Sequence, residues 1–329
     1  MQTDDEIATV DGIPVMSETI GFTTDKMVAC SNCGKQNPPN RLNCLYCGKA
    51  LELPAETAFG LQFRPAEIED WEPGVNIVVR ERVDPAAVES LGSTVFLDEN
   101  LLASVGETEV PFPLIRVRGD EADEILSRFA SAGVAAVLVD DKDLRHQQPP
   151  VRLKGLRLGE DTVEFRLFNS DDAAKFDASE IVLIVTGAIF KSSSEATLKT
   201  KKKETKRVDE KFAASDHSVI DIYTAADKAG FRILPHGFDF SCLGERKSLL
   251  AVENFAALKV MLRESFPQAI FDETYISKTS ILDQVWPRTV ENTSKGMHRV
   301  GLKVARSVGE SVSNEEQFTR YSRMRRELI

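Results

Sequence analysis

The sequence of 329 residues lacks the short motifs that assign a function directly. It contains no P-loop, no GxSxG and no HExxH, so common signatures of nucleotide-binding enzymes, serine hydrolases and zinc proteases are missing. Its longest nearly unbroken apolar run is Ile181 to Phe190, well short of the roughly 20 residues that cross a bilayer. These absences predict a chain without a membrane-spanning helix and without a standard catalytic motif.

Histidine is scarce, with four residues, and only His236 lies near a cysteine, Cys242. A Cys-His nucleophile pair is one interpretation of this segment. Phe238, Phe240 and Leu243 surround the cysteine in sequence, which favours a small buried apolar side chain instead. We therefore expect no enzyme activity.

The N-terminus lacks a secretory signal, because Met1 is followed by polar and acidic residues rather than by a basic start and an apolar stretch. The first 25 residues hold six acids and no base. We expect residues 1–27 to be disordered and the protein to be cytoplasmic.

A dominant basic face is also missing, since the formal net charge is -11. Non-specific nucleic-acid binding depends mainly on neutralised phosphates. Here positive charge is confined to patches: residues 26–50 have four bases and no acid, and residues 191–211 have eight bases against four acids. Nucleic-acid binding is therefore an alternative, whereas a protein partner or larger assembly is the favoured expectation.

The cysteines are few but clustered. Four of the five form two CxxC pairs separated by ten residues, and each pair is followed by glycine. Two such turns bring four thiolates around one tetrahedral ion, and Zn²⁺ is the usual ion in a closed four-sulfur site. Two disulfides or four free thiols are the competing interpretations. A reducing cytoplasm disfavours the disulfides, and four thiols arranged in this way are not expected by chance without a ligand. The predicted metal ligands are Cys30, Cys33, Cys44 and Cys47.

Residues 28–51, VACSNCGKQNPPNRLNCLYCGKAL, resemble the short zinc-ribbon modules of many bacterial proteins. That resemblance implies metal binding and little else, because such modules are joined to many unrelated partners. The spacing through Asn37 is also similar to the Ran-binding-protein class of zinc finger, which binds single-stranded RNA or ubiquitin. That class has Trp two residues before the first cysteine, where this chain has Val28.

The same four thiolates are also compatible with iron in a rubredoxin-like electron-transfer site. Rubredoxin resembles this segment in its two CxxCG turns, but it separates them more widely and shields the metal with aromatic residues. Only Tyr46 is aromatic here. Zinc that holds together a segment too short to fold on its own apolar surface is therefore favoured.

Residues 52–73 are rich in proline and glutamate and are predicted to be a linker. Within residues 74–145, two β-α-β patterns follow one another, which suggests a ferredoxin-like α+β sandwich. The expected strands are Val75–Val79, Thr94–Leu97, Phe112–Val117 and Ala135–Val139, with helices beginning at Asp84-Pro85 and Asp120.

Residues 150–285 change to an alternation of period two, which predicts an antiparallel β domain, a barrel or sandwich. A helix after Ser248 is expected to cap it, and a second helix is expected from Asp272 to Val285. The order of elements is similar to that of pleckstrin-homology-like domains. The expected strands contain Val151–Leu158, Val163–Leu167, Ile181–Phe190, Val219–Tyr223 and Phe231–Leu234.

Residues 191–211 interrupt this domain with its most polar stretch, which we expect to be a solvated loop. Its bases form a candidate partner-binding set, although the absence of aromatic residues argues against base stacking. The set is Lys199, Lys201, Lys202, Lys203, Lys206 and Arg207.

Residues 286–329 have no clear period until a capping box at Ser313 and Glu316, so they predict an extended arm that ends in an amphipathic helix. The apolar stripe of this helix must bury itself on its own chain or on a partner. Its members, a second candidate partner-binding set, are Phe318, Tyr321, Met324 and Leu328.

Together these patterns predict an α+β protein with a zinc ribbon, a ferredoxin-like domain and an antiparallel β domain. The favoured function is a non-enzymatic, zinc-binding scaffold that docks onto protein partners through the ribbon and the C-terminal arm. A nucleic-acid-binding regulator and an iron electron-transfer component are the two alternatives.

Overall fold

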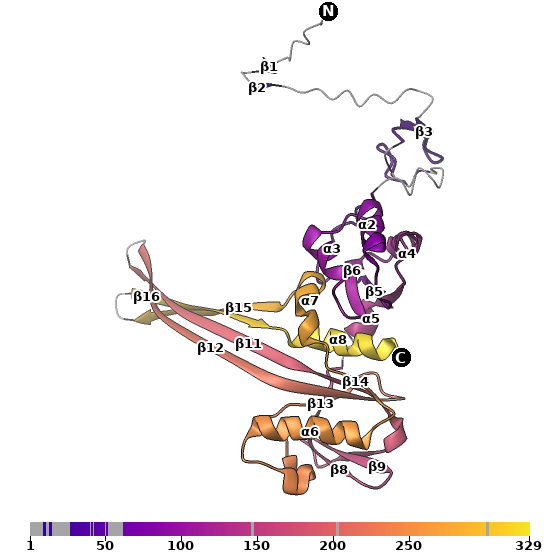
Figure 1. Ribbon diagram of the computed structural model, residues 1–329. Helices are drawn as coiled ribbons and strands as arrows, with labels where there is room; N and C mark the ends of the chain where they lie inside the picture. Colours follow the sequence, from indigo (N-terminus) through magenta and orange to yellow (C-terminus); the bar gives the residue numbers. More distant parts are fainter. Residues whose placement is uncertain are drawn as a thin grey trace, which may run out of the picture. The chain divides into compact units, whose positions relative to one another are not determined.

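The computed structural model divides the chain into two compact units, Met1–Phe63 and Arg64–Ile329 (Figure 1). Mixed helices and sheets bear out the α+β class. The predicted disordered segment 1–27 falls largely outside the described residues, as does the first part of the predicted linker. The structure describes residues 9–10, 13–14, 27–39, 41, 43–49, 51, 62–145, 148–201, 204–300 and 303–329.

The second unit begins earlier than expected, because residues 64–73 pack on its body instead of forming a linker. The guanidinium of Arg116 donates to the carbonyl oxygens of Glu69 and Glu72. Arg145 forms an ion pair with Asp70. The prolines of this segment thus belong to an ordered extended strip.

A three-stranded sheet forms the first part of this unit, with β5 (Val75–Val79) between β6 (Phe112–Val117) and β7 (Ala136–Asp140). Both neighbours run antiparallel to β5. β6 and β7 are therefore parallel to each other with β5 between them, so β6, α4 and β7 keep the expected β-α-β order. The first expected unit is wrong, because it lacks its second strand, and the ferredoxin-like sandwich is not confirmed. The helices of this part are α2 (Pro85–Thr94), α3 (Glu99–Val105), α4 (Ala122–Ser131) and α5 (Asp141–Leu144).

The expected strand Thr94–Leu97 is also a correction, because Thr94 ends α2 and α3 follows directly. The carboxylate of Asp98 accepts a hydrogen bond from the backbone N–H of Asn100 at 2.9 Å, which caps α3. The apolar pair Val95 and Leu97 is buried in the turn between the two helices rather than in a sheet.

A nine-stranded sheet forms the rest of the unit. Its main path has two ends, so the strands do not close into the expected barrel, and a pleckstrin-homology-like fold is not confirmed. The path is β10 (Ala173–Asp177), β9 (Thr162–Leu167), β8 (Val151–Leu158), β13 (Phe231–Ile233), β12 (Glu204–Thr224), β11 (Ile181–Lys201), β16 (Lys303–Ser313) and β15 (Thr289–Val300), with β14 (Ile270–Asp272) pairing β11.

The predicted capping helix is α6 (Ala251–Ser265). Its Phe255, Leu258 and Leu262 join one hydrophobic cluster with sheet residues such as Phe165 and Ile184. The expected helix Asp272–Val285 is shorter, because β14 occupies its first residue and α7 begins only at Thr279 (α7, Thr279–Val285).

The described residues of the polar stretch 191–211, which are 191–201 and 204–211, are strand rather than loop, since they belong to β11 and β12, which pair with each other. Backbone pairing with β16 on the other side of β11 supplies hydrogen-bond partners that a sequence pattern does not reveal. Of the candidate bases, Lys199, Lys201, Lys206 and Arg207 lie on these strands, and Lys202 and Lys203 fall outside the described residues.

The C-terminal arm is likewise a correction. Most of residues 286–312 form the hairpin of β15 and β16, which adds two strands to the sheet, and the helix that follows is α8 (Glu315–Glu327). Phe318, Tyr321 and Met324 are fully buried within their own unit, so they are core residues instead of a free partner-binding stripe. Leu328, just beyond the helix, is half-buried.

The start of α8 explains why it docks on its own chain. Its N-cap is Asn314 rather than the expected capping box of Ser313 and Glu316. The Asn314 carboxamide accepts from the N–H of Phe190 at 2.7 Å and donates to the carbonyl of Ala188 at 3.0 Å, so it continues the pairing of β11 like a peptide group. No helix among the described residues is both long and apolar enough to span a bilayer.

Candidate metal centre

The four predicted ligands lie on two turns of equivalent geometry. In the first, the Cys30 N–H donates to the carbonyl of Lys35 at 3.0 Å and the Gly34 N–H donates to the carbonyl of Cys30 at 2.8 Å. The second repeats this pattern between Cys44, Lys49 and Gly48 at 2.8 and 2.9 Å. Two copies of one short motif therefore face each other across the site.

Glycine is required at the end of each turn. Gly34 has φ of +69° and Gly48 has φ of +72°, a left-handed conformation that residues with a Cβ adopt at a cost. A short antiparallel pair, β3 (Val28–Ala29) with β4 (Gln36–Asn37), closes the first turn. The CxxCG spacing thus encodes the local backbone as well as the ligands.

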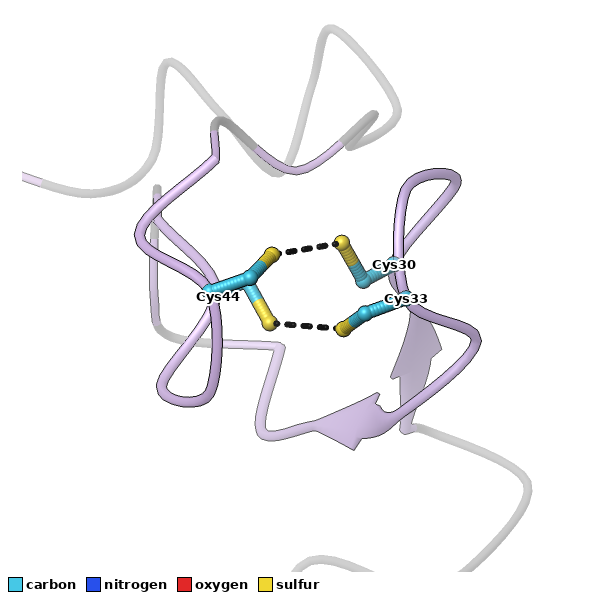
Figure 2. A group of neighbouring side chains, drawn as sticks. Cys30, Cys33 and Cys44 are labelled. Carbon is cyan, nitrogen blue, oxygen red and sulfur yellow. Dashed lines mark hydrogen bonds between the residues drawn. The ribbon is translucent and has the colours of Figure 1, made fainter.

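The four sulfur atoms converge within 4.8 Å of one another. The Sγ atoms of Cys30 and Cys47 are 3.6 Å apart, as are those of Cys33 and Cys44 (Figure 2). This separation is too long for a disulfide bond of about 2.05 Å. It fits a tetrahedral ion with metal–sulfur bonds of about 2.3 Å, whose ligands lie about 3.8 Å apart. The cluster is positioned to hold a metal ion.

Asn37 connects the two turns, and the sequence reasoning did not assign it a role. Its fully buried carboxamide donates to the Lys35 carbonyl at 2.8 Å and to Cys44 Sγ at 3.4 Å, and accepts from the Leu45 N–H at 2.8 Å. The Tyr46 N–H also donates to Cys44 Sγ at 3.4 Å. Hydrogen bonds of this kind orient ligands and stabilise thiolate charge. The sequence signal that could have identified Asn37 is the Asn-Pro dipeptide in the loop between the two CxxC pairs.

Two of the clustered thiols have pKa values shifted in opposite directions. Burial raises the pKa of Cys44, but the Tyr46 N–H and the Asn37 amide outweigh it and lower that pKa to about 6. At Cys33 the Lys35 N–H lowers the pKa, but desolvation and the neighbouring thiols outweigh it and raise it to about 12. Four negative charges at this distance repel unless a cation lies between them, and metal binding releases the remaining protons.

Apolar packing around the site is small. Cys30, Cys44 and Leu51 form the buried cluster, with Val28 half-buried against it. A cluster of this size is well below what stabilises an independent fold. The cysteines themselves are a large part of this core, so little other apolar packing supports the segment.

The other sequence candidates do not join this site. Cys242 packs against the hydrophobic cluster of the nine-stranded sheet, and burial raises the pKa of its thiol, opposite to the requirement of a nucleophile. The candidate partner-binding residues of β11, β12 and α8 belong to the other unit.

No family model matches the sequence, and neither the curated proteins nor the solved structures contain a match to it. The resemblance to a zinc ribbon therefore rests on the residues and on the four-cysteine geometry. Together they form a tetra-cysteine group positioned to hold a metal ion.

Proposed function

We propose that this chain is a non-enzymatic interaction protein in which Zn²⁺ holds the N-terminal ribbon together. The convergence of four Sγ atoms within 4.8 Å carries the proposal. Four protein ligands fill a tetrahedral ion completely, which leaves no position for water or substrate and favours a structural role. Four reduced thiols also fit a cytoplasmic protein.

The ribbon offers a surface for a partner. Leu45 and Tyr46, in the second turn, are 51% and 64% exposed although they are apolar or aromatic. The ammonium of Lys35 lies 5.6 Å from the centroid of the Tyr46 ring. Since residues 26–50 carry bases and no acid, a protein partner with an acidic surface around an apolar contact is the best fit.

The C-terminal arm contributes through its hairpin rather than through its helix. The apolar stripe of α8 is already buried, whereas the described inner part of β15 is open to solvent, with Val290 53% exposed. We therefore assign docking to the ribbon and, in the arm, to the strands that precede α8.

Elemental analysis of the purified full chain tests the metal. One zinc per chain without visible absorbance is the expected result. One iron per chain, with the visible absorbance of an iron–thiolate site, would overturn the proposal and make a rubredoxin-like electron-transfer role the better one.

A partner captured by the full chain tests the interaction. Its recovery should fall sharply with the double variant L45S/Y46S and stay unchanged with Gln36→Ala, which alters an exposed side chain on the same ribbon. The original chain and both variants must bind the same amount of zinc per chain for the comparison to hold. Equal recovery by all three would remove the ribbon surface from the proposal.

A further inference from the structure

The four strands β12, β11, β16 and β15 lie side by side and continue past the part of the sheet that the helices cover (Figure 1). Register joins Lys191 to Ser215 on one side and to Ser313 on the other. From there outward, the side chains that the structure describes include exposed ones on three different strands, Lys191, Phe212 and Glu291. This part of the sheet is thus only partly covered by its own chain.

The pairing brings two basic segments, distant in sequence, to the same outer end. Lys199 of β11 pairs with Lys206 of β12 and with Ala305 of β16. Arg299 of β15 pairs with Val304 of β16. Among the described residues of 199–207 and 298–306 there are seven bases and one acid, Glu204. The bases are Lys199, Lys201, Lys206, Arg207, Arg299, Lys303 and Arg306.

The register of the hairpin of β11 and β12 places bases opposite both acids and bases. Glu195 lies opposite Lys211, and farther out Lys199 lies opposite Lys206 and Lys201 opposite Glu204. The outer segments thus bring an excess of bases to one end of the sheet, in a chain whose net charge is -11. A polyanion is the complement of such an excess.

We propose that this end of the sheet, the basic end, binds the phosphate backbone of double-stranded nucleic acid without regard to sequence. Neither 199–207 nor 298–306 contains Phe, Tyr or Trp. Single-strand binding relies on stacking aromatics, and stable anchoring on a membrane surface adds an apolar or lipid anchor to the bases. Paired β-strands with bases are among the elements that dock on duplexes.

The proposal goes beyond the interaction function and does not depend on the ribbon. Each phosphate neutralised on duplex DNA contributes about -0.9 to the slope of log K against log salt. Contact by all seven bases corresponds to a slope of about -6, and replacing four of them makes the slope shallower by about 3 to 4.

The test uses the full chain and a fluorescent mixed-sequence DNA duplex, with binding followed by anisotropy over a salt series. The tip variant carries K199Q, K206Q, R207Q and R306Q. Its matched control carries R80Q, R82Q, K175Q and K247Q, four exposed bases on the body, so both variants lose the same charge. Thermal unfolding checks that both keep the fold.

We expect the tip variant to weaken binding at least about tenfold at low salt and to flatten the salt slope, with the control within about twofold of the original chain. Equal weakening by both variants would overturn the proposal, as would no binding by the original chain. Binding to phosphatidylserine vesicles but not to the duplex would also overturn it and assign the basic end to an anionic membrane.

Discussion

The ribbon and the body of this chain acquire their order in different ways. In the ribbon the buried apolar set is Cys30, Cys44 and Leu51, two of which belong to the four-cysteine group. In the body, fully buried side chains include Trp286, Phe165 and many others around continuous sheets. Under the proposed function the ribbon depends on a bound ion, whereas the body depends on packing and on paired buried charges.

This difference predicts that the two units respond to different perturbations. Chelators, oxidants and acid act on thiolates, so they should unfold the ribbon first. Core substitutions should affect the body alone. The four predictions that follow test this separation, beginning with the largest effect.

Cys44→Ser should remove the metal and unfold the ribbon while leaving the body intact. Structural zinc contributes about 10–16 kcal/mol of apparent binding free energy in small zinc domains, far more than the small ribbon cluster supplies. Hydrogen exchange should show lost protection across residues 27–49 and unchanged protection in the body. The control is Cys242→Ser, which lies outside the cluster and should retain the metal. Unchanged hydrogen-exchange protection of the ribbon in Cys44→Ser would contradict the prediction.

Arg232→Met should destabilise the body without affecting metal content. Arg232 donates from Nε and Nη2 to the Asp221 carboxylate at 2.7 and 2.8 Å, and both side chains are buried. Removing one partner of a buried pair costs about 3–5 kcal/mol, because the other charge stays desolvated. Urea unfolding measures this loss. Arg157→Met breaks an exposed pair with Glu164 and should cost less than about 1 kcal/mol; equal losses would count against the buried pair.

The two regions also differ in how far sequence predicted them. In the ribbon, the sequence predicted that the four cysteines lie together, because each CxxCG turn brings its own two sulfurs to the same side of a tight turn. In the body, strands such as Val75–Val79 and Phe112–Val117 were predicted to the residue. Their antiparallel pairing was not, because a strand's alternation records which side is buried but not which neighbour supplies its hydrogen bonds.

The long hairpins show the same limit. Residues 191–211 and 288–312 look like loops in sequence because no apolar alternation marks them, although their described parts pair into one sheet. The α8 stripe was recognised as apolar, but sequence could not tell burial in the same chain from burial in a partner. Asn314 and Arg232, which fix that docking, are polar residues without a periodic signal.

Gly187→Ala should test the packing of α8 on β11. A Cβ at Gly187 would lie 2.6 Å from Cε2 of Phe318 and 2.8 Å from Cδ1 of Tyr275, closer than real contacts allow. Overpacking of this kind costs about 1–3 kcal/mol. Gly106→Ala is the control, since Gly106 has a helical φ of -70° and open space around it. The thermal unfolding temperature should fall for Gly187→Ala only. Equal unfolding temperatures for the two variants would mean that the two aromatic rings move aside.

Asn37→Ala should have the smallest effect and should act on the metal alone. Its carboxamide spans the two turns through the Lys35 carbonyl and the Leu45 N–H and also donates to Cys44 Sγ. Loss of such a supporting group typically weakens metal affinity 10–100-fold. We expect about tenfold, the lower end, because the Tyr46 N–H still donates to the same sulfur.

Competition with a chromogenic chelator measures this affinity, with Gln36→Ala as the control because that neighbouring amide is exposed. Asn37→Asp sharpens the comparison: it keeps the acceptor for the Leu45 N–H but replaces the donor to sulfur with a negative charge, so it should weaken binding more than Asn37→Ala. If Asn37→Ala matched Gln36→Ala, backbone N–H groups alone would orient Cys44. The ribbon would then be organised by its two turns and its ion, without a side chain that joins them.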